Sequence, residues 1–232
     1  MIHRIGNLEE SRLNNVENLP TTRGLLSFLE MRNALSYNGS GSIITDLSGN
    51  GNNGVINGAL AIDTDKSLVF NGVGTYIATT ISNALFSGGE ASVSLYLKLD
   101  MASNSNSFKT GFIGYNNNTA TRSHYPYIDG RIYADTFRTT RVNSIVPSGS
   151  VTRTNYHQIT ITTKSGGSWK MYQNNILIKT DTAEAAISFL KQWIGRSDSL
   201  YLISGNFFSS MIYNVELTPT EISNNITYNQ AI

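Results

Sequence analysis

The chain contains no cysteine. Disulfides, thiolate metal sites and cysteine nucleophiles are therefore excluded together, and the redox compartment stays undetermined. Only 14% of the residues are charged, the formal net charge is +1, and no cluster of Lys and Arg exceeds a pair of neighbours. Proteins that bind nucleic acid by neutralising phosphates carry a basic patch, so the sequence predicts no nucleic-acid partner.

Long apolar runs are also missing. No segment approaches the ~20 consecutive apolar residues of a membrane span, so we expect no membrane insertion. The first ten residues carry charges where a signal peptide needs an apolar core. If the protein acts outside a cell, we expect it to arrive there by lysis or as part of an assembly.

Glycine and asparagine gather in residues 46–54, which run from Asp46 to Gly54 and include three glycines and three asparagines. Glycine lacks a Cβ and asparagine tolerates the left-handed region, so this composition predicts a tightly folded loop. The apolar pairs Ile43-Ile44 and Val55-Ile56 flank it and indicate a strand on each side. We interpret the stretch as a shaped loop and not as a flexible linker.

Strand patterns recur along the rest of the chain. Residues 91–100 alternate between apolar and polar side chains, which predicts a strand with one face toward a core. The dipeptides Asp129-Gly130 and Asn174-Asn175 lie between strand-like segments and predict two-residue hairpin turns. Further strands are predicted at residues 24–29, 67–71, 75–78, 108–115, 125–128, 131–134, 156–163, 168–173, 176–180, 193–195 and 207–214, and a loop at 144–154. About a dozen closely spaced strands predict an all-β fold of two packed antiparallel sheets.

The two ends of the chain differ from this pattern. Residues 1–23 concentrate charged side chains and lack strand alternation, so we expect an N-terminal arm that is either extended or briefly helical, followed by one domain at 24–232. Near the other end, Thr218, Pro219 and Glu221 have the order of an N-cap, a first-turn proline and a capping glutamate. They predict a short C-terminal helix that turns Ile222 and Ile226 inward.

The ordered motifs of residues 24–227 resemble the concanavalin A-like, laminin-G-like jelly-roll domains. The similarity rests on residues 24–30, 36–41 and 46–54, then on 67–72, 91–98, 155–159, 170–177, 195–196, 211–214 and 217–222. The opening motif is similar to versions found in bacteriophage and other viral structural proteins. The resemblance implies a two-sheet jelly-roll sandwich, but it implies no activity, because this fold hosts lectins, glucanases, interaction modules and virion parts.

Candidate catalytic residues are few. A glycosidase needs two carboxylates on a cleft, ~5 to 9 Å apart. The one acid-x-acid pair, Asp63 and Asp65, lies in a predicted loop, and we interpret it as a solvated turn. His3, His124 and His157 are too far apart for zinc-site spacing, and His157 is expected to be a structural strand residue. The serines of residues 39–42 lack the context of a nucleophile elbow. We therefore expect no catalytic residues and no enzyme activity.

Two kinds of ligand stay open. Calcium is possible because Asp46, Asp63, Asp65 and loop carbonyls could supply oxygen ligands. The neutral stretch at residues 206–210 replaces an acidic residue often found there in the resembling domains, which argues against their calcium site. Sugar binding would use exposed aromatic side chains, and strand tyrosines 125, 127, 133 and 156 are available, although such tyrosines more often cover a sheet rim. The sequence does not indicate which, if any, of Tyr125, Tyr127, Tyr133 and Tyr156 would bind a carbohydrate.

From these observations and the resemblance we expect a non-enzymatic virion structural protein, exposed on a phage-like particle as a capsid decoration, head fibre or tail component. Residues 1–23 would attach it to other virion proteins, it would be a homo-oligomer on the particle, and it would be assembled in the host cytoplasm. The alternative is a carbohydrate-binding or host-receptor-binding module that recognises surface glycans. A third hypothesis, a glucanase-like enzyme, predicts release of reducing sugar, which we do not expect.

Overall fold

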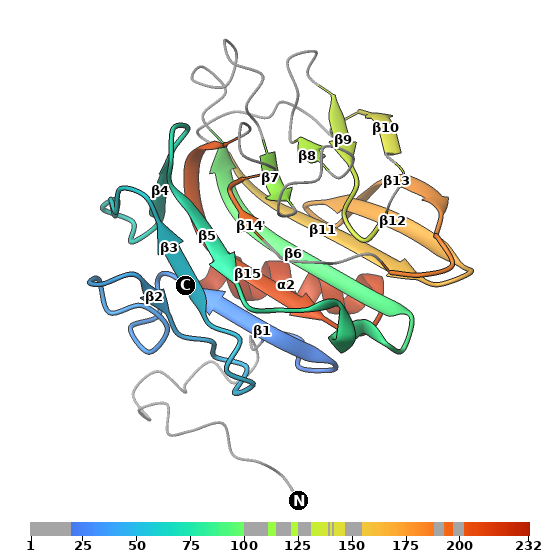
Figure 1. Ribbon diagram of the computed structural model, residues 1–232, viewed down its shortest axis with the longest axis horizontal. Helices are drawn as coiled ribbons and strands as arrows, with labels where there is room; N and C mark the ends of the chain where they lie inside the picture. The colour runs from blue at the N-terminus through green and yellow to red at the C-terminus, as the bar shows by residue number, and fades with distance from the viewer. Residues whose placement is uncertain are drawn as a thin grey trace, which may run out of the picture.

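The computed structural model describes residues 20–99, 111–114, 122–124, 131–138, 140, 142–146, 155–187, 193–196 and 202–232. Most regular structure in these ranges is β-strand, arranged in two antiparallel sheets with one α-helix near the C-terminus (Figure 1). The predicted all-β two-sheet sandwich with a short C-terminal helix is confirmed. Within the described ranges, the structure contains no helix of the length and apolar character needed to cross a membrane.

The first sheet joins strands from both ends of the described chain. Its order is β1-β15-β6-β11-β12-β13, and β4 pairs with the part of β15 beyond β1. The first strand, β1, therefore lies against the last strand, β15, with Phe28 opposite Met211. The bounds are β1 Leu25–Glu30, β4 Leu68–Asn71, β6 Glu90–Leu99, β11 Tyr156–Lys164, β12 Ser168–Gln173, β13 Ile176–Thr182 and β15 Ser204–Tyr213.

The second sheet has shorter strands and the order β10-β9-β8-β7-β14-β5-β3-β2. Its bounds are β2 Ile43–Ile44, β3 Gly54–Asn57, β5 Tyr76–Thr79, β7 Gly111–Gly114, β8 Arg122–His124, β9 Ile132–Ala134, β10 Val142–Ile145 and β14 Trp193–Ile194. A 3-10 helix, η2 Asn83–Phe86, follows β5. The paired strands β14 and β5 come from distant parts of the sequence, which places residue 193 directly beside residue 78.

Apolar side chains from alternate strand positions fill the space between the sheets. Val93 and Leu95 of β6 face Ile77 of β5 and Ile194 of β14 within one buried cluster, and all four are fully buried. Trp169 of β12 joins this cluster, and its indole nitrogen donates a hydrogen bond to the Thr136 carbonyl at 3.0 Å. Burying each large apolar side chain contributes about 1.5–3 kcal/mol, so this layer provides most of the driving force for folding.

Helix α2, Pro219–Ala231, adds a third layer on the outer face of the first sheet (Figure 1). Ile222 and Tyr228 of the helix pack with Phe28 and Met211 in a second buried cluster. Strand β6 is consequently buried on both faces, and its polar residues Ser92 and Ser94 are at most 2% exposed. The prediction of a core on one face of this strand was therefore incomplete, because the helix covers the other.

The N-terminus of α2 has the predicted cap. The Thr218 hydroxyl accepts a hydrogen bond from the Glu221 backbone N–H, and the Glu221 carboxylate accepts one from the Thr218 backbone N–H. Pro219 occupies the first helical position, where its missing N–H costs nothing. Ile222 is fully buried and Ile226 is partly buried, as the sequence predicted.

Residues 46–53 form the predicted shaped loop, Gly54 already belongs to β3, and the loop covers the open edge of β1. The Asp46 carboxylate accepts hydrogen bonds from the backbone N–H groups of Phe28, Ser48 and Asn52. The Leu26 carbonyl accepts hydrogen bonds from Ser48 Oγ and Asn52 Nδ2. An exposed strand edge can pair with another chain, so these contacts protect β1 as well as fixing the loop.

Local predictions elsewhere had mixed outcomes. Asn174 and Asn175 have φ angles of 47° and 65°, which confirms the turn between β12 and β13. The predicted loop at 144–154 was wrong at its start, because residues 144 and 145 belong to β10. Ile145 is 1% exposed, so its packing outweighs the nearby turn signals. The hairpin at Asp129-Gly130 and the strand predicted at 125–128 lie outside the described residues.

Residues 20–23 contact helix α2. The Thr21 backbone N–H donates to Asn225 Oδ1 at 2.9 Å, and Arg23 Nε lies 2.7 Å from Glu221 Oε1. Residues 1–19 lie outside the described part of the chain, so the division between an arm and a domain at residue 23 stays a prediction. Any truncation intended to leave the domain intact should nevertheless keep Thr21 and Arg23.

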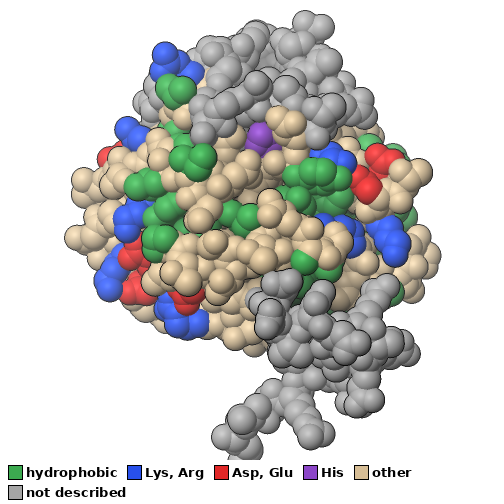
Figure 2. All heavy atoms as spheres, turned by 180° about the vertical axis from the view of Figure 1, so that it is seen from behind, with side chains coloured by type: hydrophobic (Ala, Val, Ile, Leu, Met, Phe, Trp, Pro, Cys, Tyr) green, Lys and Arg blue, Asp and Glu red, His purple; other side chains and the backbone are tan. Residues whose placement is uncertain are grey.

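The surface is weakly charged. Figure 2 shows one face of the molecule, on which charged side chains gather toward two sides, while apolar patches lie between them amid polar groups and backbone. This distribution agrees with the low content of charged residues in the sequence. The face in Figure 2 therefore presents mainly uncharged polar, backbone and apolar groups between its charged sides.

Candidate functional site

The connection between β1 and β2 folds back on itself and encloses a shallow pocket. Ser36 Oγ donates to the Thr45 carbonyl at 2.7 Å and accepts from the Glu30 backbone N–H at 3.1 Å. The Tyr37 side chain is buried beneath the loop, and its hydroxyl donates to the Gly41 carbonyl at 2.9 Å. These bonds join both ends of the connection to the sheets, so the pocket is formed without a ligand.

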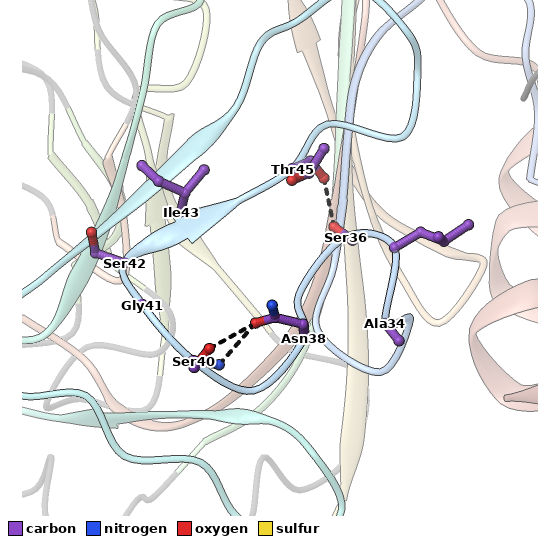
Figure 3. Close-up of a pocket in the computed structure, with 9 residues that line it drawn as sticks. Ala34, Ser36, Asn38, Ser40, Gly41, Ser42, Ile43 and Thr45 are labelled. Carbon is purple, nitrogen blue, oxygen red and sulfur yellow. Dashed lines mark hydrogen bonds between the residues drawn. The ribbon is translucent and has the colours of Figure 1, made fainter.

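The pocket has a volume of about 390 Å³ and a polar lining (Figure 3). This volume lies within the range of small-ligand sites, which is roughly 300–1,000 Å³. The polar lining side chains are Ser36, Asn38, Ser40, Ser42 and Thr45, the apolar ones are Ala34, Leu35 and Ile43, and Gly41 contributes backbone. The pocket lining thus contains no carboxylate, amine, guanidinium or imidazole group.

Asn38 orders the loop that lines the pocket. Its Oδ1 accepts hydrogen bonds from the backbone N–H and from the hydroxyl of Ser40, both at 3.1 Å (Figure 3). Two exposed apolar side chains, Leu35 at 56% and Ile43 at 50% exposure, stand beside these polar groups. The pocket therefore offers amide and hydroxyl groups together with apolar surface, a combination that suits a neutral ligand with both hydroxyl groups and C–H faces.

The sequence alone does not identify residues 34–45 as a site. The Gly and Ser content of residues 39–42 indicates a loop, and these residues lack the context of a nucleophile elbow. No local signal distinguishes a lining residue from an ordinary loop residue, because the pocket exists only once Ser36 and Thr45 have been joined. The sequence does place two large apolar residues, Leu35 and Ile43, in a stretch rich in serine, glycine and asparagine, but only the structure shows that both are exposed.

The tyrosines considered for sugar binding do not gather into one described site. Tyr156 is 41% exposed on the outer face of the first sheet, where its ring stacks on Tyr96 with centroids 5.5 Å apart. The Lys98 ammonium lies 3.9 Å from the centroid of the Tyr156 ring. Tyr133 is on β9 of the second sheet. Tyr125 and Tyr127 lie outside the described residues.

The acidic residues considered for catalysis or calcium are held by other side chains. Asp63 is exposed, and hydrogen bonds from the Thr64 backbone N–H and from Asn206 Nδ2 lower its carboxyl pKa. Burial alone would raise the pKa of Asp65, but hydrogen bonds from Ser67 and Lys98 lower it overall. The pair forms a turn before β4, as predicted, and both carboxylates are ionised at neutral pH.

Asp46 has a different role from Asp63 and Asp65. Its carboxylate accepts hydrogen bonds that hold its loop against β1. Among the residues that the structure describes, no group of three or more acidic, histidine or cysteine side chains could hold a metal ion. The possible calcium site therefore stays a prediction that rests on carboxylates already used in hydrogen bonds.

His157 is a buried strand residue, as expected. It is 2% exposed, its Nδ1 lies 3.3 Å from Gln173 Nε2, and burial lowers its imidazole pKa. His124 belongs to β8, where it lies opposite Tyr133 in the strand register. His3 lies outside the described residues, so no described arrangement brings the three histidines together.

Comparisons with solved structures find proteins that share this fold. The receptor-binding domain of botulinum neurotoxin C/D mosaic serotype has a TM-score of 0.65 and 16% identity, with 90% of this chain and 52% of that chain covered. The binding domain of Paraclostridial Mosquitocidal Protein 1 has a TM-score of 0.63 and 14% identity, covering 88% and 52%. Trypanosoma rangeli sialidase in complex with sialic acid has a TM-score of 0.66 and 14% identity, covering 91% and 34%.

This chain therefore spans only half or a third of those proteins, and at these identities the likeness shows the fold alone. Neither protein-family models nor curated protein sequences match the chain. The class that the fold defines is a two-sheet β-sandwich with a covering helix. Function has to be argued from the site.

Proposed function

We propose that this chain is a non-catalytic binding module that recognises a carbohydrate through the pocket at residues 34–45. The observation that carries the proposal is the pocket lining, which combines amide, hydroxyl and apolar groups and contains no titratable side chain. A sugar is neutral, carries many hydroxyl groups and has apolar C–H faces. The receptor-binding and binding domains among the structural neighbours support a recognition role for a sandwich of this type.

The pocket is built for binding with little reorganisation. Asn38, Ser40 and Ser36 are already fixed by hydrogen bonds within the loop, so less conformational entropy is lost when a ligand binds. Leu35 and Ile43 provide apolar surface against which a sugar ring can pack. Specificity would come from the few fixed polar groups, as in small-ligand sites generally.

The same lining argues against catalysis. Glycoside hydrolysis needs a proton donor and a second carboxylate, and the pocket supplies neither. Sialidases are among the structural neighbours, but this chain corresponds to only a third of the length of the sialidase chain. We expect no release of reducing sugar from β-glucans and no release of sialic acid from sialylated glycans.

A glycan array tests the proposal directly. The intact protein is expected to bind a limited set of glycans, and Ser42→Trp, which fills the pocket, is expected to abolish that binding. Ser87→Trp is the matched control, because it adds the same side chain at an exposed serine outside the pocket. Absence of binding by the folded protein, or equal binding by Ser42→Trp, would exclude a carbohydrate function for this pocket.

We further propose that the module is carried on a phage-like particle and is assembled in the host cytoplasm, with residues 1–23 attaching it to other virion proteins as a homo-oligomer. The charged composition of residues 1–23 and the resemblance of the opening motif to viral structural proteins support this placement. Deleting residues 1–19 keeps the contacts of Thr21 and Arg23 with α2, so the domain should fold. We expect the truncated protein to be absent from particles that incorporate the intact chain; unchanged incorporation would refute attachment through these residues.

A further inference from the structure

The pocket at residues 34–45 lies along the open edge of a strand. Strand β2 ends the strand order of the second sheet and pairs with β3, where Ile43 lies opposite Val55. The Ile56 backbone N–H donates to the Ser42 carbonyl at 2.7 Å, so Ser42 points its carbonyl toward β3. Successive residues of an antiparallel strand point their backbone groups alternately toward the partner and away from it. The N–H and C=O of Ile43 therefore point away from β3, to the side of the pocket.

Ser36 occupies the next part of this edge. The Thr45 backbone N–H donates to the Ser36 carbonyl at 2.7 Å, and the Ser36 hydroxyl donates to the Thr45 carbonyl at 2.7 Å. Thr45 has the same outward orientation as Ile43, so Ser36 stands where a further strand would pair. At Ile43 the loop has left the edge, and neither backbone group of this residue has a hydrogen-bond partner among the described residues. The pocket thus presents an unpaired backbone donor and an unpaired backbone acceptor.

Asn38 faces this edge from the other side of the pocket (Figure 3). Its Oδ1 accepts two hydrogen bonds from Ser40, which use both lone pairs of the amide oxygen. These bonds fix the side-chain amide, and Nδ2 points away from Ser40 toward the side of β2 (Figure 3). Among the described residues, none accepts a hydrogen bond from this nitrogen. A fixed amide donor therefore stands opposite the free carbonyl of Ile43.

A secondary amide complements these two groups. Because the N–H and C=O of a trans amide point in opposite directions, it can donate to the Ile43 carbonyl and accept from Asn38 Nδ2 at the same time. The Ile43 side chain is 50% exposed and offers apolar surface to a methyl group beside the amide. A secondary amide with a methyl group is an acetamido group, which N-acetylated sugars carry.

We propose that the pocket recognises the acetamido group of a neutral N-acetylhexosamine, whose N–H donates to the Ile43 carbonyl and whose carbonyl accepts from Asn38 Nδ2. The proposal rests on the carbohydrate function proposed above and adds the class of sugar. N-acetylneuraminic acid carries the same group together with a carboxylate. The pocket lining has no cationic side chain to pair with that carboxylate, so the neutral sugar is the better ligand.

An extended peptide is the other kind of ligand that binds strand edges. Addition of a strand needs a run of unpaired backbone groups, whereas the edge is in use on both sides of Ile43. Ser36 pairs with Thr45, and the Gly41 carbonyl accepts a hydrogen bond from the Tyr37 hydroxyl at 2.9 Å. The edge has room for one amide, which favours an acetamido group over a peptide strand.

Two matched pairs of sugars test the assignment in titrations followed by nuclear magnetic resonance. N,N′-diacetylchitobiose is compared with cellobiose, and methyl N-acetylgalactosaminide with methyl galactoside; within each pair, acetamido groups replace hydroxyl groups. We expect at least one acetylated sugar to bind about tenfold more tightly than its partner. Asn38→Asp keeps the acceptor for Ser40 and replaces the Nδ2 donor by an acceptor, so it should remove this preference. Asn71→Asp, the same change at an exposed asparagine at the end of β4, is the control that should keep it.

Two further probes separate the alternative ligands. Methyl N-acetylneuraminide carries the acetamido group with a carboxylate, and acetyl-dialanine methylamide carries amides without a sugar ring. Both should bind more weakly than the preferred N-acetylhexosamine. Equal or tighter binding of the first would overturn the choice of a neutral sugar, and equal or tighter binding of the second would indicate a peptide ligand and overturn the assignment.

The outcomes also separate this proposal from the carbohydrate function. Glycan-array binding that Ser42→Trp abolishes, together with equal affinities within both sugar pairs, would overturn acetamido recognition and leave the carbohydrate function intact. Absence of binding to every sugar would overturn both. A preference that survives Asn38→Asp, or that Asn71→Asp also removes, would overturn the assigned role of Asn38. Thermal unfolding of each variant checks that a loss of affinity is not a loss of fold.

Discussion

Asp46 shows how one side chain can hold a loop and a sheet edge together. The side chain is nearly buried, and its carboxylate accepts hydrogen bonds from three backbone N–H groups and from the Ser48 hydroxyl. The Asn53 side chain in turn accepts from the Asp46 backbone N–H at 2.9 Å. The acidic residue in this glycine- and asparagine-rich stretch therefore has a structural role that accounts for its position.

Asp46→Ala should lower the free energy of unfolding by about 2–3 kcal/mol, because the buried Phe28 N–H and its neighbours lose their acceptor. Urea denaturation measures the change. Asp63→Ala is the matched control, since its carboxylate is exposed and should cost about 1 kcal/mol or less. Equal losses would mean that the Asp46 hydrogen bonds add nothing beyond those of a surface turn.

Gly195, which follows β14, lies close against the buried ring of Phe70. Its φ is 83°, and a Cβ added there would lie 2.7 Å from a ring atom of Phe70. Gly195→Ala should cost about 3 kcal/mol through backbone strain and overpacking, whereas Gly51→Ala, with φ of 75° and open space around it, should cost only about 1 kcal/mol. Similar melting temperatures for the two variants would contradict the crowding at Phe70.

At the scale of the element, α2 depends on its first turn. Thr218 and Glu221 form the capping box, and Arg23, from the segment before β1, adds an ion pair to the same glutamate. The hydrogen bond from Arg23 is the largest of the effects that lower the pKa of Glu221 to about 2. The first turn of α2 is thus stabilised by its own capping box and by the ion pair with Arg23.

The lowered pKa makes this contribution dependent on pH. A carboxyl group whose pKa falls from 4.5 to about 2 on folding stabilises the protein fully above 4.5 and loses that effect as pH falls toward 2. Glu221→Gln should therefore destabilise the protein by about 1 kcal/mol at pH 7, and the difference should shrink progressively below pH 4.5. Urea denaturation at a series of pH values measures it. Thr220→Ala, an exposed first-turn control, should show no such pH dependence; a constant difference for Glu221→Gln would refute the linkage.

At the scale of the whole molecule, the second sheet, the first sheet and helix α2 form three successive layers. The paired strands β6 and β15 both contribute to the sandwich core on one face, and on the other face β15 contributes Met211 and Tyr213 to the cluster that packs with α2. Because β15 also pairs with β1 and β4, the first and last parts of the described chain are joined in one sheet. The helix and the sandwich should therefore unfold together.

Ile222→Ala tests whether the helix and the sandwich unfold together. The side chain is fully buried, so the substitution should cost about 2–4 kcal/mol, and Ile226→Ala, at a partly buried position of the same helix, should cost less. Far-UV circular dichroism and tryptophan fluorescence, which reports on the buried Trp169 and the partly exposed Trp193, should give coincident transitions in both variants. A separate early loss of helix would contradict a single cooperative unit.

The sequence by itself determined features whose causes are local. The alternation of residues 91–99, the asparagine turn at 174–175 and the capping residues 218–221 each specify backbone conformation through near neighbours. For that reason the strands, the turn and the helix start could be predicted. A local turn signal failed at Ile145, where burial against other strands outweighed it.

Only the tertiary structure decided which side chains come together on a face or around a loop. The pocket at residues 34–45 requires Ser36 to reach Thr45, and the alignment of Ile43, Val55, Ala78 and Trp193 across one sheet requires the register of four strands from separate parts of the chain. Tyr156, a candidate by composition, lies on the other sheet, while Trp193 was predicted only as part of a short strand. Side-chain neighbours across a sheet depend on strand pairing, and pairing is set by the packing of the whole sandwich, which no local pattern encodes.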